Sequence, residues 1–190
     1  MDRRVLKSQK AIKEALLELM QYTQFEKITI NSIADKANVS RGTIYLNFID
    51  KYHILEKCID DEMKKLIDIC MPINDGNTFI DLQETLINTL NYIENNSTLF
   101  IMFLKDKEKE IFKKQLLLNI KGSVITRIKL SNKVNYKNED IYINFWAIAI
   151  TDIIIWWIEN SMIYSSKEIS EQLLLILSKN KLIDPILDGK

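Results

Sequence analysis

Hydrophobic residues recur at helical spacing along most of the 190-residue chain, and turn-forming clusters interrupt them at intervals. Only 4 glycines and 2 prolines are present, which leaves little room for strands joined by tight turns. With 47% hydrophobic residues the chain can bury a sizeable core. We therefore predict an all-α fold of about nine helices, covering residues 3–22, 30–37, 41–48, 51–70, 78–95, 99–104, 107–130, 139–160 and 167–179. Asp106 is expected to cap the helix at 107–130, and Ser166 the helix at 167–179.

Two short helical patterns with a tight turn between them lie near the N-terminus. In the first, apolar residues stand at i, i+3, i+4 and i+7 from Ile30, and Thr29 can cap the helix. Asn38 follows where the chain must reverse, and asparagine tolerates the left-handed conformation that ends a helix. Val39 fills the corner. This pattern predicts the first helix and the turn of a helix-turn-helix.

The second pattern begins at Ser40, which is a good N-cap. Its inward residues are Ile44 and Phe48, and Asp50 caps a further helix that starts at Lys51. Gly42 near the helix start would let the backbone approach a phosphate. The remaining residues of this helix point outward or sideways and offer a surface for DNA: Arg41, Gly42, Thr43, Tyr45, Leu46 and Asn47.

The run IADKANVSRGTIYLNFIDK resembles the DNA-binding signature of the tetracycline-repressor (TetR) family, and the resemblance covers roughly residues 3–57. It implies that Thr43 and Leu46 face the major groove, that Tyr45 and Lys51 hold phosphates, and that Thr29 braces a phosphate. Asn31 and Ser32 fall where the family often contacts a base or the backbone. The chain departs from the family at the turn, which has Asn38 where glycine is usual, and at Asn47, where histidine or tyrosine is common. The alternative is that Tyr45 and Leu46 only pack against the preceding helix.

Charge is unevenly distributed along the chain. The whole chain balances 26 basic against 26 acidic residues, whereas residues 1–57 carry 10 basic and 7 acidic ones. Arg3, Arg4, Lys7 and Lys10 cluster at the N-terminus, where they either reach a phosphate or are simply solvated.

The later part of the chain, FWAIAITDIIIWWIENSMIYSSKEISEQL, resembles the ligand-binding domain of a Firmicutes-type branch of the same family. The resemblance implies a homodimer formed by the last two helices, and an effector pocket among the fourth to eighth helices. Trp156 and Trp157 are either interface anchors or core residues. Expected interface residues are Ile153, Ile154, Trp157, Ile169, Leu173 and Ile176. Expected effector contacts, chosen for their apolar or aromatic character, are Phe100, Phe103, Trp146 and Ala149, together with Asp152.

Asp152 is unusual because it lies among isoleucines, where a buried carboxylate is costly unless it is paired. Either it contacts a polar or cationic effector, or it bonds to Asn144, Tyr142, Arg127 or a dimer partner. Residues 141–158 are long enough to be a marginal transmembrane helix, but Asn144 and Asp152 lie within them and no basic flank marks an orientation. We expect burial in protein and no membrane partner.

Nothing in the sequence indicates catalysis or a metal or cofactor site. His53 has no cysteine or carboxylate partner at ligand spacing, and it is expected near DNA or packed against the domain. Cys58 and Cys70 lie 12 residues apart on one predicted helix, about 18 Å along its axis, which is too far for a disulfide. A reduced, cytoplasmic protein follows.

These observations predict a DNA-binding domain at residues 1–50 and an effector-binding and dimerisation domain at residues 51–190, with helix 51–70 connecting them. The expected function is a homodimeric repressor that a small molecule releases from a pseudo-palindromic, double-stranded operator. The alternative is a TetR-like co-activator that binds a protein partner instead of DNA. An enzyme is the least favoured class.

Overall fold

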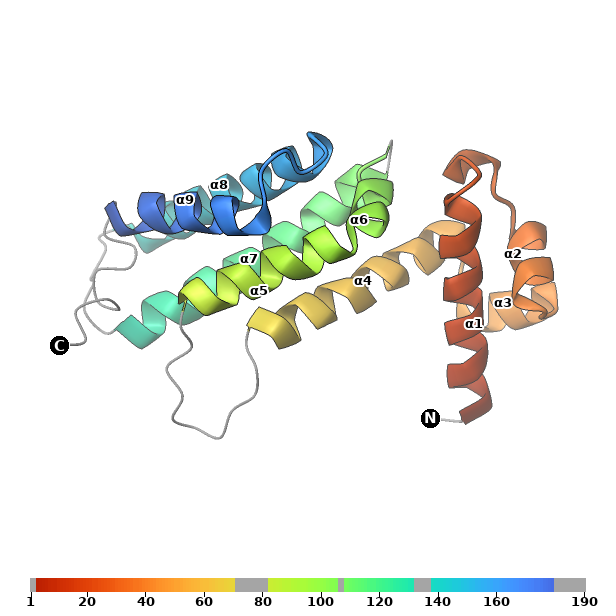
Figure 1. Ribbon diagram of the computed structural model, residues 1–190. Coiled ribbons are helices and arrows are strands. Elements are labelled where there is room, and N and C mark those ends of the chain that lie inside the picture. The colour runs from red at the N-terminus through yellow and green to blue at the C-terminus, as the bar shows by residue number, and fades with distance from the viewer. Residues whose placement is uncertain (1–2, 71–81, 106–107, 132–137, 180–190) are drawn as a thin grey trace. The chain divides into compact units, whose positions relative to one another are not determined.

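The computed structural model describes residues 3–70, 82–105, 108–131 and 138–179 (Figure 1). Within these ranges it holds nine α-helices, one short 3-10 helix and no strand, which confirms the all-α prediction. The chain packs into two compact units, Met1–Glu62 and Met63–Lys190, so the boundary between them falls inside α4. The helices are α1 (Arg3–Met20), η1 (Phe25–Lys27), α2 (Ile30–Ala37), α3 (Arg41–Asn47), α4 (Lys51–Cys70), α5 (Leu82–Asn95), α6 (Ser97–Phe103), α7 (Glu108–Ser131), α8 (Glu139–Glu159) and α9 (Ser166–Lys179).

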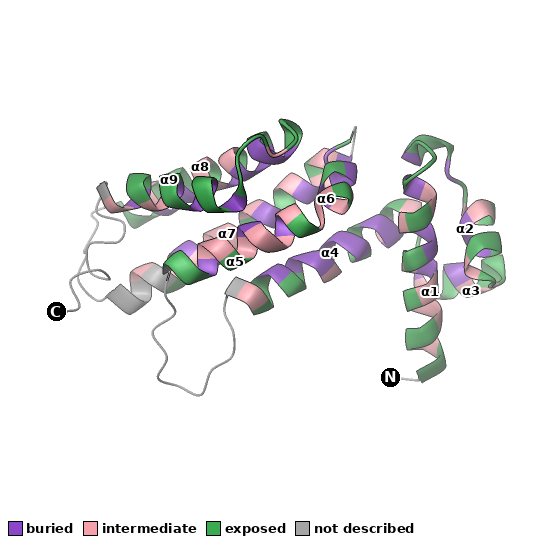
Figure 2. Cartoon of the chain, viewed as in Figure 1, coloured by how far each residue is buried: buried purple, intermediate pink, exposed green. Residues whose placement is uncertain are grey.

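The N-terminal unit is built on α1, which packs against α2 and α3 (Figure 1). Each helix turns its apolar stripe inward and leaves the opposite face to solvent, as the burial colours of Figure 2 show. The core residues with no exposed surface are Ile12 and Leu16 of α1, Ile33 of α2, Ile44 of α3, and Ile54, Leu55 and Ile59 of α4.

The first three turns of α4 belong to this unit, although the predicted domain boundary lay at residue 50. Cys58 is buried there, and its thiol lies 3.8 Å from the backbone oxygen of Lys13 on α1. The ammonium of Lys13 pairs in turn with the carboxylate of Asp61. Because these contacts join α1 to α4, α1 to α3 do not form a closed domain without the start of α4.

In the C-terminal unit, α7 packs along α8, α5 packs along α9, and α6 contacts α5, α7 and α8. Phe100 and Phe103 of α6 and Phe112 of α7 are fully buried and lie 5.8–6.3 Å apart between ring centroids. A second apolar cluster joins α7, α8 and α9 through Val124, Ile143, Trp146 and Leu177. The apolar interior of this unit therefore has an aromatic part at α6 and a second part around Trp146, where aliphatic side chains pack with the ring of Tyr142.

Helix α8 is the apolar helix that resembled a membrane span. Among the described residues it alone is long and apolar enough to cross a bilayer, and 44% of its most apolar stretch is buried inside the protein. It packs along α7 and against α6, with Trp157 fully buried. Helix α8 is therefore partly buried by its own unit, as expected for residues 141–158, and the rest of its apolar surface is exposed.

Most predicted helix limits agree with the structure to within two residues. Helix α6 begins at Ser97, two residues before the predicted start. The predicted cap of α9 was wrong by one residue: Ser165, rather than Ser166, forms the capping pair, because its backbone N–H and hydroxyl bond to the Glu168 carboxylate. The Ser166 hydroxyl instead bonds to Asn91 on α5. The predicted start of the fifth helix at residues 78–81 and the predicted cap Asp106 lie outside the described residues.

Candidate nucleic-acid interface

Helix α2 begins with a reciprocal hydrogen-bond pair. The Ser32 backbone N–H donates to the Thr29 hydroxyl at 3.1 Å, and the Thr29 backbone N–H donates to the Ser32 hydroxyl at 3.0 Å. This capping box satisfies two N–H groups that the first helical turn leaves unpaired. The predicted cap Thr29 is confirmed, and both Thr29 and Asn31 are exposed at this end of α2.

The turn after α2 is made by Asn38 in the left-handed conformation, with φ 52° and ψ 48°. Its backbone N–H donates to Asp35 at 3.2 Å, and the N–H of Val39 donates to Ala34 at 3.0 Å. These bonds close the last turn of α2 in the manner of a helix C-cap. The structure therefore confirms that asparagine can take the place of the usual glycine at this turn.

Three polar side chains of the α3 region bond to the helix itself. The Ser40 hydroxyl accepts a hydrogen bond from the Thr43 backbone N–H at 3.1 Å, which confirms Ser40 as the N-cap. The Ser40 and Thr43 hydroxyls lie 2.9 Å apart, and the Asn47 amide donates to the Thr43 carbonyl at 2.7 Å. Their hydrogen-bonding capacity is therefore partly used before any ligand arrives.

The outer face of α3 carries one cationic, one aromatic and one apolar side chain. Ile44 and Phe48 are buried, as predicted, while Arg41 is exposed. Tyr45 is 53% exposed and Leu46 is 87% exposed, so these two side chains do not merely pack against α2. Leu46 is therefore an apolar side chain that its own unit leaves open to solvent.

Ile49 was not expected in this surface, yet it is 77% exposed immediately after α3. It lies beyond the helix end at Phe48, so helical periodicity did not place it on the outer face. The sequence did give one indication: Ile49 is an apolar residue in the segment that connects α3 to α4, where a core contact is seldom needed. Leu46 and Ile49 are therefore both apolar side chains exposed to solvent, at the end of α3 and just beyond it.

Gly42 is not required by the fold. A Cβ atom built on it would meet only the Ser40 hydroxyl, at 3.6 Å, which is an ordinary van der Waals distance. The backbone there is helical, without positive φ. Any need for glycine at this position therefore comes from outside the free protein.

Lys51 was expected to bind a phosphate. In the structure its ammonium forms hydrogen bonds with backbone carbonyls of the segment before α2. It donates to the carbonyls of Phe25, Glu26 and Ile28 at 2.8–2.9 Å. Nearby, the Asp50 carboxylate accepts from the His53 backbone N–H at 2.8 Å, which confirms Asp50 as the cap of α4. His53 Nδ1 accepts from the Ile49 N–H at 3.1 Å, so this histidine packs at the junction of α3 and α4.

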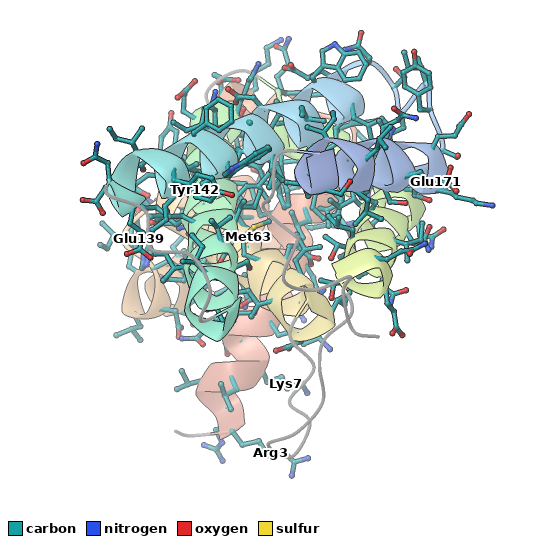
Figure 3. The ribbon with its side chains drawn as sticks, turned by 90° about the vertical axis from the view of Figure 1, so that its left-hand side faces the viewer. Arg3, Lys7, Met63, Glu139, Tyr142 and Glu171 are labelled. Carbon is teal, nitrogen blue, oxygen red and sulfur yellow. The ribbon has the colours of Figure 1, made fainter. Side chains whose placement is uncertain are left out.

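The N-terminal basic residues lie on the first turns of α1. Arg3 and Lys7 extend their side chains away from the helix axis (Figure 3), and both are exposed. Lys36 of α2 pairs with Glu18 of α1 at 2.7 Å, and this hydrogen bond raises the pKa of Lys36. At the start of α1, Arg3 and Lys7 are thus exposed cations, and the ammonium of Lys10 lies 3.7 Å from the carboxylate of Glu14.

The expected effector contacts do not form one group. Phe100 and Phe103 belong to the aromatic cluster at α6, and Trp146 belongs to the cluster between α7, α8 and α9. Ala149 is half-buried. Asp152 is exposed rather than buried, and its carboxylate pairs with Lys113 of α7 at 2.7 Å, a partner that sequence reasoning did not consider.

Most residues expected at the dimer interface are instead buried within a single chain. Ile154, Trp157, Ile169 and Leu173 are buried within the unit, Ile153 is half-buried, and Ile176 is exposed. The exposed apolar residues of α8 lie instead on a neighbouring stripe at spacings of four, three and eight: Ile141, Phe145, Ile148 and Trp156. A long helix that is apolar all round does not show in its sequence which side faces its own domain.

Comparison with known proteins places both parts of the chain. Residues 12–58 match the model of bacterial regulatory proteins of the tetR family, and residues 81–179 match a transcriptional regulator C-terminal region of the same group. An uncharacterised HTH-type transcriptional regulator of Bacillus subtilis, YxbF, is 26% identical over 181 residues, which are 90% of this chain and 44% of YxbF. The chain thus spans less than half the length of that relative.

Solved structures share the fold. The dihydroxyacetone kinase operon activator DhaS has a TM-score of 0.67 at 21% identity, covering 91% of this chain and 95% of DhaS. FadR from Bacillus subtilis, solved with stearoyl-CoA, has a TM-score of 0.62 at 20% identity, covering 88% of this chain and 96% of FadR. With a capped helix-turn-helix in its N-terminal unit and family models matched over both units, the chain belongs to the tetR family of bacterial transcriptional regulators.

Proposed function

We propose that this protein is a cytoplasmic, homodimeric repressor that binds a pseudo-palindromic operator through α3 and leaves it when a small molecule binds the C-terminal unit. The observation that carries the proposal is the outer face of α3. There Arg41, Tyr45 and Leu46 are exposed while Ile44 and Phe48 anchor the helix from behind. No catalytic step is part of this function.

Base reading would fall to Leu46 and Thr43, with Arg41 beside them. An exposed leucine can contact the methyl group of thymine, and arginine can donate two hydrogen bonds to guanine. The Tyr45 hydroxyl and the exposed end of α2 at Thr29 and Asn31 would contact phosphates, which fix the register of the helix on the duplex. The backbone at Gly42 would approach the same strand, with Ser40 and Asn47 at either end of α3.

The exposed stripe of α8 supports dimerisation. Phe145 is 60% exposed, and Ile148 and Trp156 lie on the same side of the helix. On α9, Leu175 and Ile176 are also exposed, and the two helices lie side by side in both views (Figures 1 and 3). Soluble monomers seldom leave such apolar surface open, and a two-fold axis would pair the stripe with its copy. A dimer would present two α3 helices about 34 Å apart to successive major grooves.

The interior of the C-terminal unit supports an apolar effector. The buried Trp146 indole N–H has no hydrogen-bond partner in the described part of the chain, and it lies in an apolar cluster with Val124 and Ile143. A ligand with an acceptor oxygen would satisfy that donor, whose burial without a partner costs about 1–3 kcal/mol. FadR, which was solved with stearoyl-CoA, has a comparable fold. Release of DNA requires only that the ligand prefer one of two states of the protein, and α4 continues from the first unit into the second.

A mobility-shift assay tests the function directly. The purified protein is titrated against the DNA upstream of its own and neighbouring genes across a salt series, with Tyr45→Ala as the test variant. Tyr22→Ala is the matched control, because Tyr22 is an exposed tyrosine of the same unit outside α3. A salt-sensitive shift that Tyr45→Ala loses and Tyr22→Ala keeps supports the proposal. Absence of any shift favours the co-activator that docks on a protein.

A further inference from the structure

Three backbone carbonyls converge on the ammonium of Lys51. Its Nζ lies 2.8 Å from the oxygen of Phe25, 2.9 Å from that of Glu26 and 2.9 Å from that of Ile28. A lysine ammonium has three N–H donors and no acceptor. All three donors are therefore used within the free protein.

The site fits an ammonium for two physical reasons. A carbonyl oxygen has two lone pairs, so the Phe25 carbonyl, which accepts the Ile28 N–H at 3.0 Å, can accept a second hydrogen bond from the ammonium. The ammonium also lies 4.7 Å from the centroid of the Phe25 ring and 5.7 Å from that of Tyr52, and the two rings meet edge to face. Carbonyl dipoles and ring faces thus act on the same charge.

The bonded residues stand at the two ends of the helix-turn-helix. Ile28 immediately precedes the capping box at Thr29 that starts α2, and Lys51 is the first residue of α4 just after α3. The Lys51 side chain thus connects the segment before α2 to the start of α4, which follows α3. These contacts join residues 23 to 26 positions apart in the sequence.

We infer that Lys51 is a positioning residue for DNA binding: it closes the helix-turn-helix at its two ends and does not contact a phosphate. Through this tie, the capping box of α2 and the start of α4 hold a constant separation, and α3 is presented between them. The inference rests on the proposed DNA-binding function. It replaces the phosphate contact that the family resemblance implied for this residue.

A substitution of Lys51 by arginine distinguishes a positioning residue from a residue that contacts a phosphate. An arginine in place of a phosphate-binding lysine keeps the charge and can bond the phosphate in two places. A planar guanidinium cannot direct three donors to three oxygens grouped around one point, as an ammonium does. Loss of a phosphate contact also lowers the slope of log K against log salt by about one, whereas loss of a positioning contact leaves that slope unchanged.

The first experiment needs no variant. Free wild-type protein is treated with limiting acetic anhydride, and the acetylation rate of each lysine is followed by mass spectrometry. Lys27 is the matched control, because it lies on η1 itself and is exposed. We expect Lys51 to react at least tenfold more slowly than Lys27 in the absence of DNA. Equal acetylation rates overturn the inference, because the ammonium of a lysine that only binds phosphate is accessible to the reagent until DNA binds.

The second experiment compares Lys51→Arg, Lys51→Met and Lys27→Met in the full chain. We expect both Lys51 variants to bind operator at least tenfold more weakly than wild type with an unchanged salt slope, and to exchange the amide hydrogens of residues 25–32 faster. Lys27→Met should keep the wild-type exchange pattern. Wild-type affinity in Lys51→Arg, or a shallower slope in Lys51→Met, overturns the inference. If wild type binds no DNA, the proposed function fails, while acetylation and exchange still test the tie.

Discussion

The carboxylate of Asp152 on α8 lies 2.7 Å from the ammonium of Lys113 on α7. The side chains are 49% and 40% exposed, so water and salt weaken the attraction. The hydrogen bond to Asp152 raises the pKa of Lys113. Asp152 therefore has a partner within its own chain and does not need an effector to neutralise its charge.

Asp152→Asn is expected to leave the effector response unchanged and to lower stability only slightly, because exposed pairs contribute about 0–1 kcal/mol. Since the folded-state pKa of Lys113 is raised, the contribution of the pair is present below the ordinary lysine value of 10.5 and is lost as pH rises through the raised pKa. Thermal melts of wild type and Asp152→Asn between pH 7 and strongly alkaline pH measure this. A changed effector response at neutral pH would restore a ligand role for Asp152.

Gly42→Ala is expected to weaken operator binding at least tenfold while leaving the melting temperature equal or slightly higher. The added methyl group fits the free protein, and alanine favours a helix over glycine by about 1 kcal/mol. Gly122→Ala on α7 is the control, because its added Cβ meets nothing within 4 Å and the position is exposed. It should gain stability and bind DNA normally. Full operator affinity in Gly42→Ala would show that no backbone approach takes place there.

Leu46→Ala is expected to lose affinity roughly fourfold for each thymine methyl it contacts, taking about 0.8 kcal/mol per buried methylene-sized group. Operators with uracil in place of thymine lack that methyl group. The wild-type protein should therefore bind them more weakly than the thymine operator, while the affinity of Leu46→Ala should not change. Leu118→Ala, an exposed leucine of α7, serves as the control. Equal sensitivity of wild type and Leu46→Ala to uracil would contradict the assignment.

Cys58 is expected to be unreactive in the folded protein. Burial raises the pKa of its thiol to about 12, so the reactive thiolate is scarce near neutral pH. In a Cys70→Ser background, labelling with a maleimide should occur only after denaturant unfolds the N-terminal unit. Rapid labelling of native protein would mean that α1 and α4 separate readily at this contact.

Phe145→Lys is expected to shift the protein from dimer to monomer in analytical ultracentrifugation and to weaken operator binding with it. The charge would lie in the middle of the exposed apolar stripe of α8, where burial against a second copy is unfavourable. Leu118→Lys places the same charge on an exposed position of α7 and should remain dimeric. A dimeric Phe145→Lys would move the interface away from this stripe.

Features that depend on neighbouring residues were predictable from the sequence. The caps at Thr29, Ser40 and Asp50 and the left-handed Asn38 were all predicted from residue type and spacing, and the structure confirms them. Each involves groups within a few positions of one another, so local chemistry decides it. The outward position of Tyr45 and Leu46 followed from the inward stripe of the same short helix.

Features that depend on distant residues were decided by tertiary structure. Helix α8 is apolar on almost every side, so its sequence could not tell that Trp157 is buried while Phe145 and Asp152 are exposed. Lys51 bonds to carbonyls 23 to 26 positions earlier, and backbone acceptors carry no sequence signal. The sequence by itself determined the helices, the caps of α2, α3 and α4 and the outward face of α3, because those follow from contacts within one or two turns. The faces of long apolar helices and the partners of Lys51 and Asp152 were settled only by packing, which brings together residues that no local pattern relates.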